Sequence, residues 1–304
     1  MRVAVLGSLN IDLVTTVERL PQRGETVPGV SFGRYPGGKG LNQAVAAARL
    51  GAEVLLFGRV GKDPFGTELL SVAKENGVDA SFVEPVDAQT GTAAILVDPT
   101  GENMIAYTPG ANALVDETYL EKILPVLASV DVLLIQVEIP ISTVGAVLRR
   151  LPPERPLVIL NPSPAQDLTS LYLGRVDVLV PNVQEFQVLT GWAGGPEELE
   201  RVGRTFLSFG VKALVVTAGA AGAYLVEPEG FARFPAFPVA AVDTTGAGDA
   251  FCAGLAVKLG QGRGLYEAIG FANAAAALAT TKKGAVPSLP TLSEVQAFLA
   301  RFTD

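Results

Sequence analysis

The sequence predicts an α/β fold of three layers, with a mostly parallel central sheet between helices, and a small additional β-sheet. Short apolar runs recur along the chain, and several of them are separated by segments with helical spacing. Two other segments alternate apolar and polar residues around turn sequences, as hairpins do. Of the 304 residues 49 % are apolar and 18 % are charged, which supplies a large core and argues against bulk disorder.

The central strands are expected where continuous apolar runs are short, because strands buried on both faces carry apolar side chains at most positions. Six runs fit this description: residues 2–6, 54–57, 132–135, 157–160, 176–180 and 213–216. A helix is expected over residues 41–48, where apolar side chains are spaced i, i+3, i+4 and i+7 and Gly51 follows as a stop. An alanine-rich helix is expected around residues 271–280.

Two segments are expected to lie outside the main sheet. Residues 11–36 contain an alternating stretch followed by several prolines and glycines, and residues 92–108 contain two apolar stretches around a turn at 98–101. We predict that they form a small β lid inserted into one α/β domain that spans residues 1–304. A few strands alone are marginally stable and expose free edges, so we expect two lids to pair in a homodimer.

Composition excludes several classes of function. The chain has no histidine, which excludes Ser-His-Asp hydrolysis and His-ligated zinc, and leaves Asp, Glu, Lys or Tyr as a general base. The formal net charge is −8 and no basic run is present, so a nucleic-acid partner is not expected. The N-terminal residues read as a buried strand, and no segment approaches about 20 apolar residues, so we expect neither a signal peptide nor a membrane span.

The chain contains a single cysteine, Cys252, so an internal disulfide is excluded. This usage fits a reducing compartment, and we expect a cytoplasmic location. We expect the Cys252 side chain to be a small buried filler, because a nucleophilic role would need a histidine partner.

The first motif with chemical content is DTTGAGDAF at residues 243–251. It follows a strand-like run at 237–242 and opens a helical pattern, so Gly246, Ala247 and Gly248 can present backbone N–H groups to an anion. Asp249 would lie beside them and accept a proton from an alcohol, which is the arrangement that phosphoryl transfer needs. The alternative is a capped helix start in which Asp249 only complements the helix dipole.

The second motif is GGKGLNQA at residues 37–44. Together with Gly33 it has the G-x-x-x-x-G-K spacing of a P-loop, but Gly40 stands where a P-loop has Ser or Thr to hold magnesium. We therefore interpret it as a glycine turn that brings the backbone close to a polar ligand at a helix start, with Asn42 on the inner face. A plain turn with a helix cap is the alternative.

Isolated polar residues follow the ends of several expected strands, which is where open α/β sheets bind ligands. They are Asn10, Asp12, Glu138, Asn182 and Glu185. Each alone could be a loop residue or a helix cap, and their shared placement favours a binding site. Asn273 is the polar exception within the alanine-rich helix.

The sequence resembles the ribokinase-like (PfkB) carbohydrate kinases over essentially its whole length. The resemblance rests on GSLNID (7–12), GGKGLNQA (37–44), PGAN (109–112), QVE (136–138), NPSPA (161–165), PNVQE (181–185), VTAGAAGAY (216–224), DTTGAGDAF (243–251) and TKKGAVPS (281–288). The two glycine signatures in this order and spacing are specific. The implied fold is a ribokinase-like three-layer α/β/α domain with a small lid sheet, and the implied activity is phosphoryl transfer from ATP-Mg²⁺ to a sugar.

The resemblance also implies roles for individual residues. Asp249 would be the catalytic base, with Gly246, Ala247 and Gly248 as the anion hole. The sugar hydroxyl groups would be held by Asn10, Asp12, Gly38, Lys39, Asn42 and Glu138. The nucleotide would lie near Thr217, Gly219, Gly222 and Asn273, and Asn182 and Glu185 would organise magnesium and phosphate. A monovalent cation, K⁺, would bind near Asp243, Thr245, Ala285 and Ser288.

Ribose is the expected acceptor, because the polar side chains suit a compact polyol and aromatic residues form only 7 % of the chain. A kinase for another sugar or a nucleoside, and a binding regulator without catalysis, are the alternatives. The presence of Asp249 disfavours the regulator. A Rossmann dehydrogenase is excluded, because no G-x-G-x-x-G follows the first strand.

Overall fold

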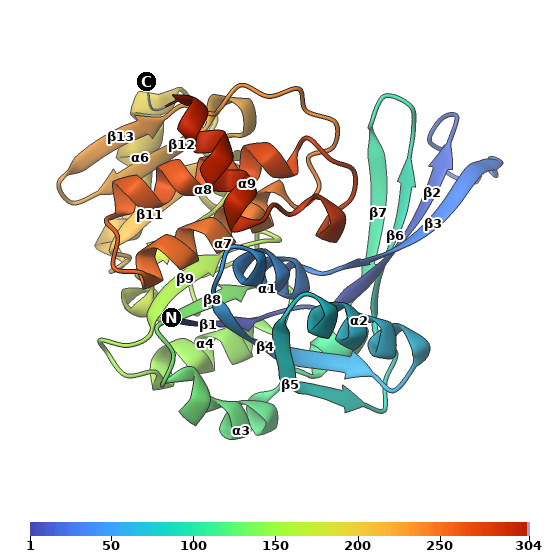
Figure 1. The fold of residues 1–304 in the computed structure, drawn as a ribbon, viewed down its shortest axis with the longest axis horizontal. Coiled ribbons are helices and arrows are strands. Elements are labelled where there is room, and N and C mark those ends of the chain that lie inside the picture. Colours follow the sequence, from blue (N-terminus) through green and yellow to red (C-terminus); the bar gives the residue numbers. More distant parts are fainter. Residues whose placement is uncertain (303–304) are drawn as a thin grey trace.

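The computed structural model describes residues 1–302 and shows a nine-stranded sheet with helices on both faces (Figure 1). The strand order is β13-β12-β11-β10-β9-β8-β1-β4-β5, and all neighbours from β11 to β5 are parallel. The strand bounds are Arg2–Leu6 (β1), Glu53–Gly61 (β4), Val78–Val86 (β5), Val132–Gln136 (β8), Leu157–Asn161 (β9), Val178–Leu179 (β10), Ala213–Thr217 (β11), Ala223–Glu227 (β12) and Gly230–Phe234 (β13). All six expected strands are present, so the predicted α/β class is confirmed.

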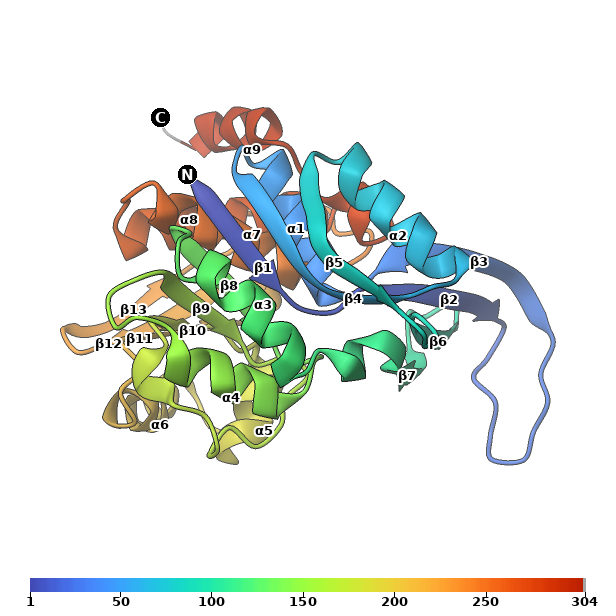
Figure 2. The ribbon, with the colours of Figure 1, turned by 90° about the horizontal axis from the view of Figure 1, so that it is seen from below.

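Helices form two layers that enclose the sheet, and Figure 2 shows the two layers from the side. One layer contains α1 (Lys39–Arg49), α2 (Pro64–Glu75), α7 (Ala247–Gly260), α8 (Leu265–Ala279) and α9 (Leu292–Leu299). The other contains α3 (Glu117–Leu127), α4 (Ile141–Arg150), α5 (Val183–Thr190) and α6 (Pro196–Ser208). The buried apolar residues accordingly form two clusters, one on each face of the sheet.

Local sequence signals set several helix ends. Asp63 and Asp116 begin α2 and α3, because their side chains accept hydrogen bonds from Gly66 N and Tyr119 N. The expected stop of α1 is also found, since Gly51 follows the helix with φ +94°. Within residues 1–302, none of the helices has the length and apolar character needed to cross a membrane.

The apolar run at 237–242 is not a strand, which corrects the prediction made for it. The main sheet ends at β13, and this run does not pair with its free edge. Instead the Phe237 ring packs against the Phe298 and Phe302 rings, with centroids 5.4 and 5.0 Å away, and Val242 N donates to Thr280 O at 2.7 Å. The run therefore serves as an irregular cover over α8 and α9.

The two segments expected outside the main sheet form a second, four-stranded sheet of order β3-β2-β6-β7. Its strands are Asn10–Val17 (β2), Gly29–Gly37 (β3), Gly91–Val97 (β6) and Asn103–Thr108 (β7). Two antiparallel pairs, β2 with β3 and β6 with β7, are joined by parallel pairing of β2 with β6. The sheet projects to one side of the α/β core (Figure 1). It exposes large apolar side chains: Val30, Phe32, Tyr35, Met104, Ile105 and Tyr107.

Candidate active site

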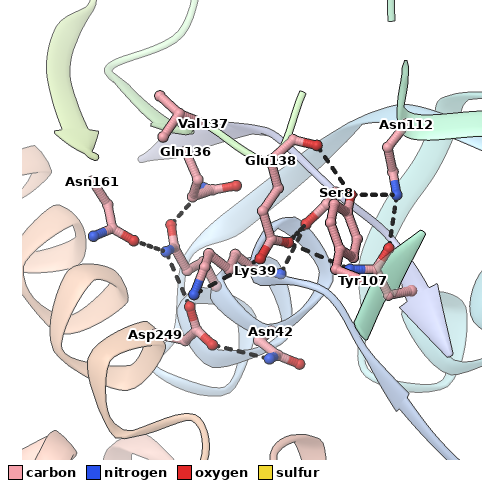
Figure 3. A network of polar contacts seen from close by, with 12 residues as sticks. Ser8, Lys39, Asn42, Tyr107, Asn112, Gln136, Val137, Glu138, Asn161 and Asp249 are labelled. Atoms are coloured by element: carbon pink, nitrogen blue, oxygen red, sulfur yellow. Dashed lines mark hydrogen bonds and ion pairs between the residues drawn. The ribbon is translucent and has the colours of Figure 1, made fainter. Parts of the chain in front are cut away.

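Polar side chains converge where the carboxyl ends of β1 and β8 meet the first turns of α1 and α7 (Figure 3). The contacts that join them link Asn10, Asp12, Lys39, Asn42, Glu138 and Asp249. These residues come from the small sheet, both helices and the end of β8. The structure therefore brings together the residues expected to hold a sugar and the residue expected to act as a base.

Asp249 lies in the first turn of α7, which begins after Gly246 in the left-handed region at φ +80°. Its side chain is buried, and both carboxylate oxygens accept amide N–H groups. Asn42 Nδ2 donates to Oδ2 at 2.9 Å, and Gln43 Nε2 donates to Oδ1 at 3.1 Å. Burial raises the pKa of Asp249, while Lys39 and the two amides oppose the rise. The result is a poorly hydrated carboxylate in a fixed orientation.

Lys39 is the cation among these carboxylates. Its Nζ lies 3.9 Å from Glu138 Oε1. Burial lowers the pKa of Lys39, but the carboxylates of Asp249, Glu138 and Glu185 outweigh this and hold the pKa above its ordinary value. Lys39 therefore stays charged and offsets part of the negative charge of the site.

Asp12 lies on β2, so the small sheet contributes an acid to the site. Its pKa is raised to about 6, first by burial and then by the charges of Glu138 and Asp249. Gly37 leaves room for this side chain, because a Cβ at position 37 would lie 2.5 Å from Asp12 Oδ2. The neighbouring Gly38 has φ +91°, and a Cβ there would lie 2.7 Å from Ser8 O. Gly38 is thus required by its positive φ and its close approach to backbone atoms, whereas Gly37 makes room for the Asp12 side chain.

Two residues without a predicted role of their own organise this end of the site. Ser8 is fully buried; its Oγ donates to Glu138 Oε2 and accepts from Lys39 N at 3.0 Å. Asn112 is also fully buried and its Nδ2 donates to Asn10 Oδ1 at 2.7 Å, while its Oδ1 accepts from Leu9 N at 3.0 Å. Both residues lie in motifs that carried the family resemblance, which is the signal that could have singled them out.

A cavity of about 180 Å³ adjoins Asp249. Its lining includes residues from two strand ends and three helix starts: Lys39, Asn161, Asn182, Glu185, Thr217, Gly246, Gly248 and Asp249. Asn182 and Glu185 form a capping box at the start of α5, in which Asn182 Oδ1 accepts from Glu185 N at 2.8 Å and Glu185 Oε2 accepts from Asn182 N at 2.9 Å. Asn182 and Glu185 therefore cap α5 and also line the cavity, and the cap does not exclude a role in ligand binding.

The glycine turn before α7 differs in one detail from the expected anion hole. Ala247 N donates to Thr244 O at 3.2 Å, so this amide already has a partner. Gly246 and Gly248 line the cavity, and a Cβ at position 248 would meet open space. Gly246 and Gly248 therefore face the cavity, while the Ala247 amide makes a turn contact in this structure.

The residues expected near a nucleotide separate into two groups. Thr217 lines the cavity, and Gly219 opens toward free space. Gly222 and Asn273 do not line it. A Cβ at position 222 would overlap Phe234 O, and Asn273 Nδ2 donates to the same oxygen at 3.4 Å. These two residues therefore meet the end of β13 and the residue after it.

The residues expected near a monovalent cation lie together beside the glycine turn. Asp243 Oδ1 accepts from Thr245 Oγ1 at 2.7 Å, and Oδ2 accepts from Gly284 N at 2.8 Å. Burial raises the pKa of Asp243, but these hydrogen bonds outweigh it and hold the pKa low. Ser288 Oγ donates to Ala285 O at 2.8 Å. The group offers a carboxylate and carbonyl oxygens, the ligand types that alkali cations take, although several oxygens already accept protein hydrogen bonds.

A half-buried arginine at the end of α1 supports the same loop. Arg49 Nη1 donates to Val286 O and Leu289 O, each at 2.8 Å. Within residues 1–302, no cluster of three or more Cys, Asp or Glu side chains could hold a metal ion by itself.

Comparison with known proteins identifies the family. Residues 1–292 match the pfkB family of carbohydrate kinases. The ribokinase of Bacillus subtilis is 40 % identical over 300 residues, which cover 98 % of this chain and 99 % of that protein. The solved ribokinase of Thermotoga maritima has a TM-score of 0.89 at 36 % identity, with 98 % of this chain and 99 % of that chain covered. Arabidopsis thaliana ribokinase, solved with ribose and ATP, has a TM-score of 0.87 at 33 % identity over 98 % of each chain. The chain therefore belongs to the pfkB family of carbohydrate kinases.

Proposed function

We propose that this chain transfers the γ-phosphoryl group of ATP to a hydroxyl group of D-ribose, giving ADP and ribose 5-phosphate. The observation that carries the proposal is the position of Asp249. Its buried carboxylate lies between the polar cluster of Asn10, Asp12 and Glu138 and the cavity that adjoins the start of α7. A base in this position would lie between an acceptor hydroxyl bound at the polar cluster and a phosphate bound in the cavity.

In the proposed reaction the ribose hydroxyl oxygen attacks the γ-phosphorus, and Asp249 accepts the hydroxyl proton. The bond between the γ-phosphorus and the bridging oxygen breaks, and ADP leaves with that electron pair. A carboxylate base fits a chain without histidine. Lys39 favours the ionised form of Asp249 and therefore keeps the base ready to accept a proton.

The sugar would be held by the polar side chains on the small-sheet side of Asp249. Asn42 supports this part of the proposal, because its buried Oδ1 has no hydrogen-bond partner within residues 1–302. A buried acceptor without a partner is costly, and a sugar hydroxyl would satisfy it. Asp12 and Glu138 add carboxylate acceptors at the same site.

The phosphates would lie in the cavity that Gly246, Gly248, Asn182 and Glu185 line. The N-terminus of α7 and the glycine backbone suit an anion there. Asn182 and Glu185 offer the oxygen ligands that Mg²⁺ prefers, and would hold it directly or through water. When bound, Mg²⁺ would neutralise charge on the phosphates, while Lys39 would orient the transferred group.

We further propose that K⁺ binds near Asp243 and Ala285 and supports the glycine turn, since a Cβ at Gly246 would lie only 3.3 Å from Ala285 Cα.

We also propose a homodimer formed through the small sheet, whose exposed apolar residues support it. The consumption of ATP supports a cytoplasmic location.

The test is a coupled ADP-release assay with ribose, 2-deoxyribose, fructose and adenosine under saturating ATP-Mg²⁺. Ribose should have the highest kcat/KM, and the loss of one hydrogen-bonded hydroxyl should cost 2-deoxyribose about 5- to 150-fold. A higher kcat/KM for fructose or adenosine would reject ribose and keep the kinase. No ADP release with any acceptor would reject the kinase itself.

A further inference from the structure

We infer that Gln43 is a positioning residue for the catalytic base, held in one orientation by a chain of buried amides. The inference rests on the proposed function, in which Asp249 is the base. Gln43 is fully buried on α1 and is not among the residues that line the cavity. It touches Asp249 directly, so it can act on the reaction without contacting substrate.

Both amide protons and the oxygen of the Gln43 side chain have hydrogen-bond partners. Nε2 donates to Asp249 Oδ1 at 3.1 Å and to Asn161 Oδ1 at 3.2 Å. Oε1 accepts from Gln136 Nε2 at 2.6 Å. A rotation of this amide by 180° would place its oxygen against the Asp249 carboxylate and lose all three hydrogen bonds.

The direction of the chain is set by a backbone carbonyl. Asn161 Nδ2 donates to Val180 O at 2.8 Å, so Asn161 Oδ1 must face Gln43. Asn161 Oδ1 in turn requires an N–H from Gln43, and the same Nε2 reaches Asp249. The Val180 carbonyl, which follows β10, thus determines that Gln43 presents an N–H donor, and not its oxygen, to Asp249.

The main sheet supplies the support for this chain. Gln136 and Asn161 are paired partners at the carboxyl ends of β8 and β9. Both lie at the rim of the sheet, which is rigid because each of these strands is paired on both sides. Figure 3 shows Gln136, Asn161 and Asp249 directed toward a common point. The two adjacent strand ends therefore fix one carboxylate oxygen, while Asn42 contacts the other on the side expected to hold the sugar.

The arrangement has a consequence for proton transfer that packing alone would not have. An N–H donor stabilises the ionised carboxylate, so the Gln43 hydrogen bond lowers the pKa of Asp249 against the effect of burial. Loss of this donor should favour the protonated form, which cannot accept a proton. The acidic limb of the kcat profile should then move to higher pH.

The experiment compares Gln43→Met with Gln136→Met as a matched control, because both remove a buried amide but only Gln43 touches Asp249. The kcat is measured across pH with saturating ribose and ATP-Mg²⁺. We expect Gln43→Met to lower kcat about 10-fold or more and to move the acidic limb to higher pH, with a smaller change in the KM for ribose. Gln136→Met keeps the direct hydrogen bond from Gln43 to Asp249 and removes only a partner that orients Gln43, so it should move the limb less than Gln43→Met.

The inference is overturned if the acidic limb of Gln43→Met stays at the parent pH, or if both variants move it equally. If Gln43→Met does not fold, Gln43→Asn replaces it, since this variant keeps an amide but shortens its reach, and the same shift is required. Asp249→Asn is assayed in parallel. A parental kcat in Asp249→Asn rejects the proposed function, whereas a low kcat there with an unmoved limb in the Gln43 variant rejects only this inference.

Discussion

Gly7 and Gln136 lie so close together that a methyl group on Gly7 would be 2.9 Å from Gln136 Cδ and would overlap Gln136 Oε1. Gly7 follows β1 and Gln136 ends β8, its parallel neighbour. The Gln136 amide cannot turn away freely, because its Nε2 donates to Gln43 at 2.6 Å. The arrangement of the buried amides beside Asp249 therefore requires that position 7 has no side chain.

The first prediction is that Gly7→Ala displaces Gln136 and weakens both stability and activity. Overpacking of a buried site costs about 1–3 kcal/mol, and the displaced amide should lower kcat. Thermal unfolding and kcat are measured for this variant and for Gly270→Ala, a glycine in α8 where a Cβ meets open space. The control should be neutral or slightly stabilised. Equal behaviour of the two variants would contradict the prediction.

The second prediction is that Asp249→Asn leaves a folded protein with kcat reduced about 100-fold or more, because a general base is lost. The fold should tolerate the new amide. Asn42 can rotate its side chain and use Oδ1, which has no partner within residues 1–302, to accept the new N–H. The measurements are kcat and the melting temperature. A near-parental kcat would remove Asp249 from the mechanism.

The third prediction concerns pH. The pKa of Asp12 is raised to about 6, so its carboxylate becomes protonated as the pH falls through that value. A protonated Asp12 loses acceptor capacity for sugar hydroxyl groups, so kcat/KM for ribose should fall below about pH 6 while kcat at saturating ribose falls less. In Asp12→Asn the drop near this pH should disappear. The prediction fails if the parent and this variant have the same profile.

The fourth prediction is activation by K⁺. A cation near Asp243 would hold the loop that contacts Gly246 without touching substrate. The ADP-release rate and the melting temperature should both rise when K⁺ replaces a bulky organic cation at constant ionic strength. Asp243→Asn should reduce both responses. A flat response of the parent protein to K⁺ would count against this site.

The fifth prediction is a dimer through the small sheet. Light scattering at micromolar protein should report about twice the chain mass of 31.6 kDa. Ile105→Glu should produce monomers, because Ile105 is 59 % exposed on β7. Phe209→Glu is the control, since Phe209 is 60 % exposed but lies after α6, in the α/β core. A parent protein that is monomeric with and without ribose would refute the interface.

The central sheet and the small sheet could be predicted because each has a strong local pattern. Strands such as 132–135 are apolar at every position, and the turn at 98–101 separates two short strands. The outer strands were not predicted. β5 contains Pro85 and polar residues, and β13 contains Arg233, since strands near a sheet edge are not buried on both faces. The run at 237–242 was wrongly predicted as a strand, because it is apolar but its side chains pack on helices and not within a sheet.

The acidic and basic residues of the site could be predicted from their placement after strands and in glycine motifs. The amides Gln43, Gln136 and Asn161 also lie in motifs of the family resemblance. Their joint arrangement could not be predicted, because they come from three separate elements and their chemistry depends on which way each amide faces. That direction is determined by Val180 O, a backbone atom with no sequence signature. Asn182 and Glu185 show the related difficulty that one pair of residues satisfies both a helix cap and a ligand site.

Helix α1 connects two parts of the site that are far apart along its axis. Its first turns carry Lys39, Asn42 and Gln43, and at its last residue Arg49 donates to the carbonyls of Val286 and Leu289. With 11 residues the helix is about 16 Å long. It therefore acts as a rigid spacer that fixes the distance between the base and the 285–289 loop. A displacement of this loop would tilt α1 as a rigid body and move Asn42 and Gln43 relative to Asp249. No ligand would need to span the two parts of the site.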